Sequence, residues 1–278
     1  MKKVVLFISI LIASVLFSDK ASAQGKYGAD SAECIKYLSY YTEYYKQKNY
    51  ESALPNWRKA YFYCPPTARY SLLQHGTTLL KKQIAKSTTT AEYRKQLIDS
   101  LMTIYNQRIE FKPIKQNVLV DAYNNRAIDM YNYLKDDEET LYKGLSDAIL
   151  NNGIETSSKI FVLHFNTACN LYQKGILTAD QVMTDYQNDI EILSQIPASN
   201  DIQKKLILKS VEDIESLLIQ SQIATCDKLI DLFTPRYEAA PEDLTLAKNI
   251  VKMLQVADDC VDNDLYLNAV NTIYKLEP

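Results

Sequence analysis

The sequence predicts an all-α protein in which about six helix pairs stack into a right-handed α–α superhelix. Apolar residues recur at helical spacing along nearly the whole chain. Only 6 of the 278 residues are glycine and alternating β-branched runs are few, which disfavours sandwiches and barrels. The segment 34–67 has the length of one helix–turn–helix unit, and repetition near 34 residues indicates stacked helix pairs.

The N-terminus has the three parts of a secretory signal peptide. Lys2 and Lys3 carry positive charge, residues 4–17 form an apolar run, and residues 21–23 (Ala-Ser-Ala) form a small-x-small cleavage site. The apolar run of 14 residues is shorter than the roughly 20 that a membrane-spanning helix needs, so a membrane anchor is the less favoured alternative. We expect removal of 1–23 and export, to the periplasm or to the inner side of an outer membrane.

The first part of the mature chain, 24–112, reads as two helix pairs. Asn49 is a suitable N-cap for the second helix and Thr90 for the fourth. The segment Phe111-Lys112-Pro113 ends the fourth helix, because the residue before a proline avoids the helical conformation. The predicted helices are 32–47, 50–63, 67–85 and 91–109.

The middle part, 113–198, contains two further pairs. Asn and Gly can take the left-handed conformation that ends a helix, and residues 151–153 (Asn-Asn-Gly) and 174–175 (Lys-Gly) are such stops. The acidic residues at 136–139 are expected to cap a helix start rather than to bind a cation. Thr178 is the predicted N-cap of the last helix. The predicted helices are 114–134, 138–151, 157–173 and 178–195.

The last part, 199–278, follows a break at 196–200 (Ile-Pro-Ala-Ser-Asn). Pro241 is predicted in the first turn of a helix, where a missing N–H is tolerated. Residues 275–278 look like the end of one repeat that a further repeat should follow. We therefore expect either that the sequence is a fragment or that a partner caps the last helix. The predicted helices are 201–219, 222–237, 241–259 and 264–276, in one continuous stack with soft boundaries near 112 and 198.

The first helix pair resembles a tetratricopeptide repeat (TPR). That family places Ala, an aromatic residue, Ala and Pro on the second helix of its repeat, and this chain has Ala53, Trp57, Ala60 and Pro65 there. The first helix departs from the pattern at Tyr41, where a small residue is usual. The last pair keeps the spacing with poor residue identity, and the middle fits weakly. The resemblance implies a TPR-like solenoid with a concave binding groove, and an unrelated α–α superhelix would have the same mechanics.

Five cysteines lie in the part expected to be exported, where disulfides persist. Cys34 and Cys64 are equidistant from the first turn, so they should meet at the open end of an antiparallel pair. Cys226 and Cys260 are nearly equidistant from the turn around 240, which predicts a second disulfide. Cys169 is left over. Five packed thiols are the alternative, whereas wide spacing and the absence of adjacent histidines disfavour a metal site.

Tyrosines crowd the first predicted helix. Spacings of three and four place them on or beside one face of that helix. Some are expected to pack against Trp57 and Tyr61, and others are candidates for contact with a ligand in the concave groove, because tyrosine binds with little loss of entropy. These candidates are Tyr37, Tyr40, Tyr41, Tyr44 and Tyr45.

The sequence contains no nucleophile elbow, phosphate-binding loop or dinucleotide-binding glycine motif. His75 and His164 are 89 residues apart, each on an apolar helical face, where a structural role is expected. The acidic turn at 258–264 lacks the glycine and the distal glutamate of a calcium loop. We therefore expect no enzymatic activity, no cofactor and no metal.

Charge and hydropathy narrow the possible partners. The net charge of −3 becomes about −5 once the three lysines and one aspartate of 1–23 are removed, and no basic run suggests nucleic-acid binding. No apolar stretch after residue 23 is long enough to cross a membrane. We expect a scaffold that binds a protein or peptide in the cell envelope. The alternative is a glycan- or peptide-binding accessory of an outer-membrane uptake system, and an enzyme is a third option.

Overall fold

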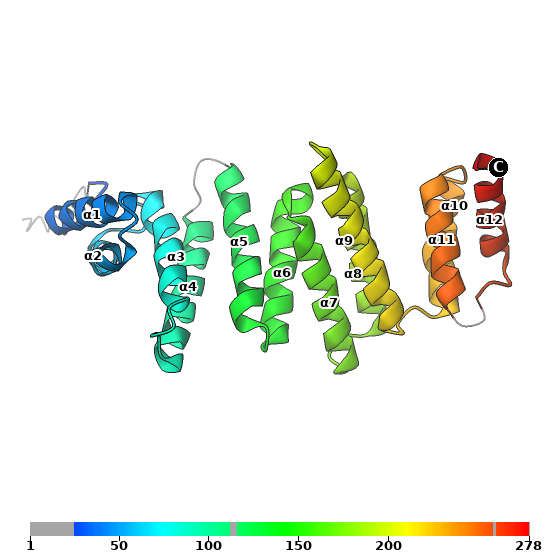
Figure 1. Ribbon diagram of the computed structural model, residues 1–278, viewed down its shortest axis with the longest axis horizontal. Coiled ribbons are helices and arrows are strands. Elements are labelled where there is room, and N and C mark those ends of the chain that lie inside the picture. The colour runs from blue at the N-terminus through cyan, green and yellow to red at the C-terminus, as the bar shows by residue number, and fades with distance from the viewer. Residues whose placement is uncertain (1–24, 112–115, 258–259, 278) are drawn as a thin grey trace, which may run out of the picture. The chain divides into compact units, whose positions relative to one another are not determined.

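The computed structural model describes residues 25–111, 116–257 and 260–277, and every regular element in these ranges is a helix (Figure 1). The predicted all-α class is therefore confirmed. The predicted signal peptide at 1–23, most of the break at 111–113 and part of the acidic turn at 258–264 lie outside these ranges. The chain divides into two compact units, unit 1 (residues 1–82) and unit 2 (residues 83–278), which are described separately.

Unit 1 is built on an antiparallel pair of helices. The turn between them falls where it was predicted: Lys48 adopts a positive φ of 58°, and the Asn49 side chain caps the second helix by accepting a hydrogen bond from the Ser52 N–H at 3.2 Å. The helices are α1 (Ser31–Lys46), α2 (Tyr50–Tyr63) and α3 (Tyr70–Ile84), the last of which ends just beyond the unit.

The single tryptophan organises the core of unit 1. The Trp57 indole N–H donates to the Leu72 carbonyl at 2.7 Å, which joins α2 to α3. The Trp57 ring also fills the space beside Gly76, where a Cβ atom would overlap it. Ala53 and Ala60 are buried on the same face of α2, which packs closely against α1.

Most helices of unit 2 pack against their neighbours in sequence, α7 also packs against α9, and α9 contacts α11. Local sequence again sets the boundaries: Thr90, Asp137 and Thr178 cap helices through their side chains, and Gly175 takes a positive φ of 72°. The helices are α4 (Ala91–Glu110), α5 (Gln116–Leu134), α6 (Glu138–Asn152), the short η1 (Gly153–Glu155), α7 (Ser158–Gln173), α8 (Ala179–Gln195), α9 (Asp201–Gln220), α10 (Cys226–Ala239), α11 (Leu244–Val256) and α12 (Asp264–Leu276).

Two predicted boundaries in unit 2 differ from the structure. The helix predicted from 222 begins at Cys226, because Gln222 has a positive φ of 56° and Thr225 precedes the helix in an extended conformation. Pro241 lies in the turn before α11 rather than inside it. The Asp243 side chain accepts hydrogen bonds from the N–H groups of Thr245 and Leu246, and this stronger cap fixes the helix start.

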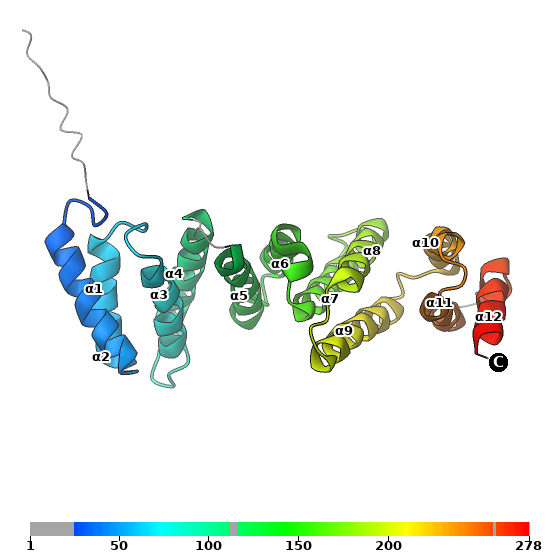
Figure 2. The same ribbon diagram turned by 90° about the horizontal axis from the view of Figure 1, so that it is seen from above.

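Helix α7 lies at the centre of unit 2, beside α6, α8 and α9 (Figures 1 and 2). Nine of its residues are buried, and two of them, Phe161 and Phe165, belong to one continuous apolar core with Tyr186 and Phe233. A helix that is apolar nearly all round must be covered on most sides. Its one buried histidine, His164, is therefore held among the neighbouring helices. No helix of the described ranges is long and apolar enough to cross a bilayer.

Both predicted cysteine pairs lie at disulfide distance. Cys34 is bonded to Cys64 with their Cα atoms 4.9 Å apart, and Cys226 is bonded to Cys260 with their Cα atoms 5.1 Å apart. Cys169 is free and buried on α7, and burial raises the pKa of its thiol to about 11. A buried thiol that stays protonated behaves as a small apolar residue.

We expect an unreduced tryptic digest to contain the Cys34–Cys64 and Cys226–Cys260 links, with Cys169 alkylated only after unfolding. In the chain-entropy model, a closed loop of about 31 residues stabilises by roughly 3–4 kcal/mol, so replacing both Cys34 and Cys64 by serine should lower the free energy of unfolding of unit 1 by that amount. Urea unfolding followed by Trp57 fluorescence measures it. The matched control replaces Cys226 and Cys260 and should leave this transition unchanged. Recovery of Cys34 and Cys64 on separate alkylated peptides would contradict the prediction.

The close approach of α2 and α3 gives a second prediction for unit 1. In Gly76→Ala the added methyl group overlaps the Trp57 ring, and the cost of overpacking, about 1–3 kcal/mol, exceeds the helix-propensity gain of about 1 kcal/mol. We expect the free energy of unfolding to fall by up to about 2 kcal/mol, with a changed Trp57 emission spectrum. Gly25→Ala, where nothing lies within 4 Å of the added atom, is the control. Equal stability of both variants would show that α3 does not pack on Trp57 as described.

Candidate functional site

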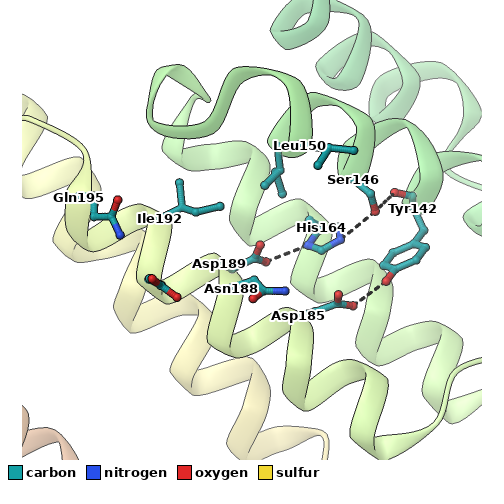
Figure 3. A pocket seen from close by; sticks show the side chains of 11 residues that line it. Tyr142, Ser146, Leu150, His164, Asp185, Asn188, Asp189, Ile192 and Gln195 are labelled. Atoms are coloured by element: carbon teal, nitrogen blue, oxygen red, sulfur yellow. Dashed lines mark hydrogen bonds and ion pairs between the residues drawn. The ribbon is translucent and has the colours of Figure 1, made fainter. Parts of the chain in front are cut away.

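A pocket of about 600 Å³ opens in unit 2 among α6, α7 and α8 (Figure 3). The lining residues of α6 recur mostly at intervals of three or four positions, and so do those of α8. Each helix therefore presents one face to the pocket. Helix α7 contributes a single side chain, His164. The lining residues are Tyr142, Ser146, Ile149, Leu150, His164, Asp185, Asn188, Asp189, Glu191, Ile192 and Gln195.

The His164 ring joins the two walls. It is only 4% exposed, and its Nδ1 atom lies 2.8 Å from Asp189 Oδ2 on α8. Its Nε2 atom lies 3.0 Å from Ser146 Oγ on α6. The Tyr142 ring stacks on the imidazole with centroids 5.0 Å apart, and its hydroxyl donates to Asp185 Oδ2 at 2.7 Å. We call these five side chains the His164 network.

Hydrogen-bond donors and acceptors indicate where the protons of this network lie. The Ser146 hydroxyl is 2.8 Å from the Tyr142 carbonyl oxygen, which can only accept, and we place the hydroxyl proton on this contact. Ser146 Oγ is then the acceptor for an N–H at His164 Nε2, and Asp189 is the acceptor for an N–H at Nδ1. A ring that donates from both nitrogens is an imidazolium. We infer that His164 and Asp189 form a buried ion pair.

The pKa of His164 agrees with this assignment, whereas that of Asp189 records the cost of burying its charge. Burial by itself lowers the pKa of His164, but the Asp189 carboxylate in contact with the ring outweighs burial, and the pKa is raised above its usual value. For Asp189, burial raises the pKa of the carboxyl group and the charged ring opposes this. Both groups therefore bind protons more tightly in the folded chain than in the unfolded one. Burial also raises the pKa of Tyr142, so its hydroxyl remains a donor to Asp185.

Serine, histidine and aspartate in this order are also the components of a nucleophilic triad, and two features weigh against that use here. The Ser146 proton is directed to the Tyr142 carbonyl and away from the ring that would have to accept it. Ser146 lies in the interior of α6, where backbone N–H groups are consumed by the helix and cannot form an oxyanion hole. The chemistry suits a fixed polar wall better than an activated nucleophile.

The pocket is acidic on one side and apolar on the other. Asp185, Asp189 and Glu191 supply three carboxylates, and neither lysine nor arginine is among the lining residues. Ile149, Leu150 and Ile192 form the apolar part. Leu150 is 83% exposed at the rim, an unusual position for a large aliphatic side chain. A smaller pocket of about 360 Å³ among α5, α7 and α9 is lined by Tyr131, Asn166, Asp213 and their neighbours.

The tyrosines predicted to bind lie on α1 in unit 1 and divide into packed and exposed groups. Tyr41 is fully buried and contacts His75 edge-on, and Tyr45 stacks on the same imidazole with centroids 3.9 Å apart. Tyr37 stacks on Tyr63. Tyr40 and Tyr44 keep about half and more than a third of their surface exposed, respectively. Contact between this exposed surface and a ligand stays a prediction.

Sequence reasoning assigned His164 a structural role and did not find the pocket around it. The signals were present but separate: Tyr142 and Ser146 are four residues apart, and so are Asp185 and Asp189. Each pair places two polar groups on one face of a helix that otherwise carries core residues. Only packing against α7 brings both pairs to one imidazole. In the described ranges no three His, Cys, Asp or Glu residues are grouped to hold a metal ion.

The ion pair predicts how the stability of unit 2 depends on pH. Because the folded-state pKa of His164 is raised, its stabilisation is complete below about pH 6.5 and is lost as the pH rises through the folded-state value. We expect the free energy of unfolding of unit 2 to fall over this range, by at most about 1.4 kcal/mol per pH unit for one proton. Asp189→Asn should flatten the slope.

Urea unfolding at pH 6 to 8, followed by helical circular dichroism, measures this slope, and Trp57 fluorescence separates the contribution of unit 1. His75 is the matched control, because burial lowers its pKa. Its contribution to the pH dependence of the free energy of unfolding therefore has the opposite sign. His75→Gln should therefore leave the slope of unit 2 intact. A slope that is the same in Asp189→Asn and in the unsubstituted protein would contradict the ion pair.

Comparisons with known proteins identified no relative of this chain. No protein-family model, no curated protein and no solved structure matches this chain. The function is therefore argued from the residues of the pocket and from the packing around them.

Proposed function

We propose that this protein is an exported helical-repeat scaffold that binds a protein or peptide partner in the cell envelope through the α6–α8 pocket. The observation that carries the proposal is the pocket itself, in which an apolar rim faces a polar wall held in place by the His164 network. Binding pockets of this size combine apolar area with a few convergent polar groups. A buried ion pair that anchors the polar wall keeps it in position before the partner arrives.

We further propose that the helix pairs form a right-handed α–α superhelix of TPR type. The burial of Ala53, Trp57 and Ala60 supports this, because these residues occupy the packing positions of a TPR second helix. The two disulfides support export, since disulfides persist in oxidising compartments. With the signal-peptide pattern at 1–23, they favour the periplasm or the inner side of an outer membrane.

A pull-down from envelope extracts tests the proposal with two exposed aliphatic side chains of unit 2. Leu150 lies at the rim of the pocket, and Ile202 on α9 is 73% exposed away from it. We expect the unsubstituted protein and Ile202→Ser to capture one stoichiometric protein and Leu150→Ser to lose most of it. Both substitutions remove an exposed aliphatic side chain, so both should fold normally.

Three outcomes would contradict the proposal. Equal capture by Leu150→Ser and Ile202→Ser would remove the pocket from the interface. Binding of an oligosaccharide alone would favour an accessory of a glycan uptake system. Covalent labelling of Ser146 by a fluorophosphonate would show that its hydroxyl is an activated nucleophile and that the protein is an enzyme.

A further inference from the structure

We propose that the α6–α8 pocket receives a lysine or arginine side chain from an extended segment of the protein partner. This inference rests on the proposed function and adds the chemistry of the recognised group. It follows from the charge, the pairing and the shape of the pocket lining.

In the described part of the chain, Asp185 and Glu191 lack the cationic partner that several other acidic residues of unit 2 have. Glu138 on α6 pairs with Lys174, and Glu215 on α9 pairs with Lys252. Asp185, in contrast, accepts a hydrogen bond from the neutral Tyr142 hydroxyl, and no lysine or arginine of the described ranges forms an ion pair with it. A half-buried carboxylate without a counter-charge favours a cation supplied from outside the chain.

The neutralisation of Asp189 by His164 leaves Asp185 and Glu191 as the uncompensated charges facing the pocket. An anionic ligand would face repulsion from both. A neutral apolar ligand would have to desolvate Asp185 without replacing its interaction with water, which costs free energy. A cation is the class of ligand that gains from both Asp185 and Glu191.

The shape of the pocket distinguishes a long basic side chain from a small cation. Figure 3 shows Tyr142 and Asp185 at one end of the pocket and Ile192 and Gln195 at the other. Lysine and arginine pack their aliphatic stems on apolar surface while their charged ends reach polar groups. Leu150 and Ile192 can cover such a stem while the charged end meets Asp185. The exposed rim at Leu150 leaves room for the backbone that carries the side chain.

The test uses the full-length mature protein labelled with ¹⁵N and blocked peptides of the form Gly-Gly-X-Gly-Gly. With X as lysine or arginine, we expect saturable shifts of the backbone amides of α6 and α8. With norleucine, which keeps the lysine stem and lacks the charge, binding should be about tenfold weaker, or about 1.4 kcal/mol. With glutamate no saturable shift is expected.

Substitutions locate the charge that matters. Asp185→Asn should weaken binding of the lysine peptide about tenfold. Glu191→Gln should also weaken binding, and because Glu191 is exposed, this substitution should leave the fold intact. Glu139→Gln is the matched control, because Glu139 is an exposed carboxylate on α6 that does not line the pocket. Binding to Glu139→Gln should stay within twofold of the unsubstituted protein.

Several results would overturn the inference. These are equal binding of the norleucine and lysine peptides, equal weakening by Glu139→Gln and Asp185→Asn, and the absence of shifts with any peptide. Tighter binding of 1,5-diaminopentane than of the lysine peptide would replace the partner segment by a free amine. If Leu150→Ser loses the captured protein while the lysine peptide fails to bind, the scaffold proposal stands and only the basic side chain is excluded.

Discussion

The buried ion pair between His164 and Asp189 is the interaction on which the arrangement of α6, α7 and α8 depends. A buried charge is tolerated only when it is paired and hydrogen-bonded, and both ring nitrogens of His164 have partners. Removing one partner of such a pair typically costs about 3–5 kcal/mol, because the other charge stays buried without compensation. The pair therefore fixes the register of α7 against α8, and Ser146 extends the constraint to α6.

This constraint separates structural from recognition roles among the polar side chains. His164, Asp189 and Ser146 satisfy one another, so they define the wall of the pocket and leave little capacity for a ligand. Asp185 keeps a carboxylate open to the pocket although it accepts one hydrogen bond from Tyr142. The same arrangement distinguishes these Ser-His-Asp contacts from a catalytic triad: the serine hydroxyl accepts a hydrogen bond from the ring instead of donating one to it.

Much of the fold was predictable because helix ends are set by local chemistry. Asn49, Thr90 and Thr178 cap their helices through their own side chains, and the disulfide of Cys34 follows from its distance to a single turn. The boundaries at 222 and 241 were wrong where a non-glycine residue adopts a positive φ and where Asp243 offers a better cap than Pro241. The pocket was not predictable, because it joins faces of three helices whose mutual register is set by contacts between residues far apart in the sequence.

The most direct test of the account is the protonation state of the His164 ring in the folded protein. Ring-nitrogen NMR of ¹⁵N-labelled protein, with His75→Gln to assign the signals, reports whether each nitrogen carries a proton. We predict that both His164 nitrogens are protonated at pH 6.5 and that the ring titrates above its usual pKa. A neutral ring protonated at Nδ1 alone would contradict this prediction, since Nε2 would then accept a hydrogen bond from the Ser146 hydroxyl as in a catalytic triad.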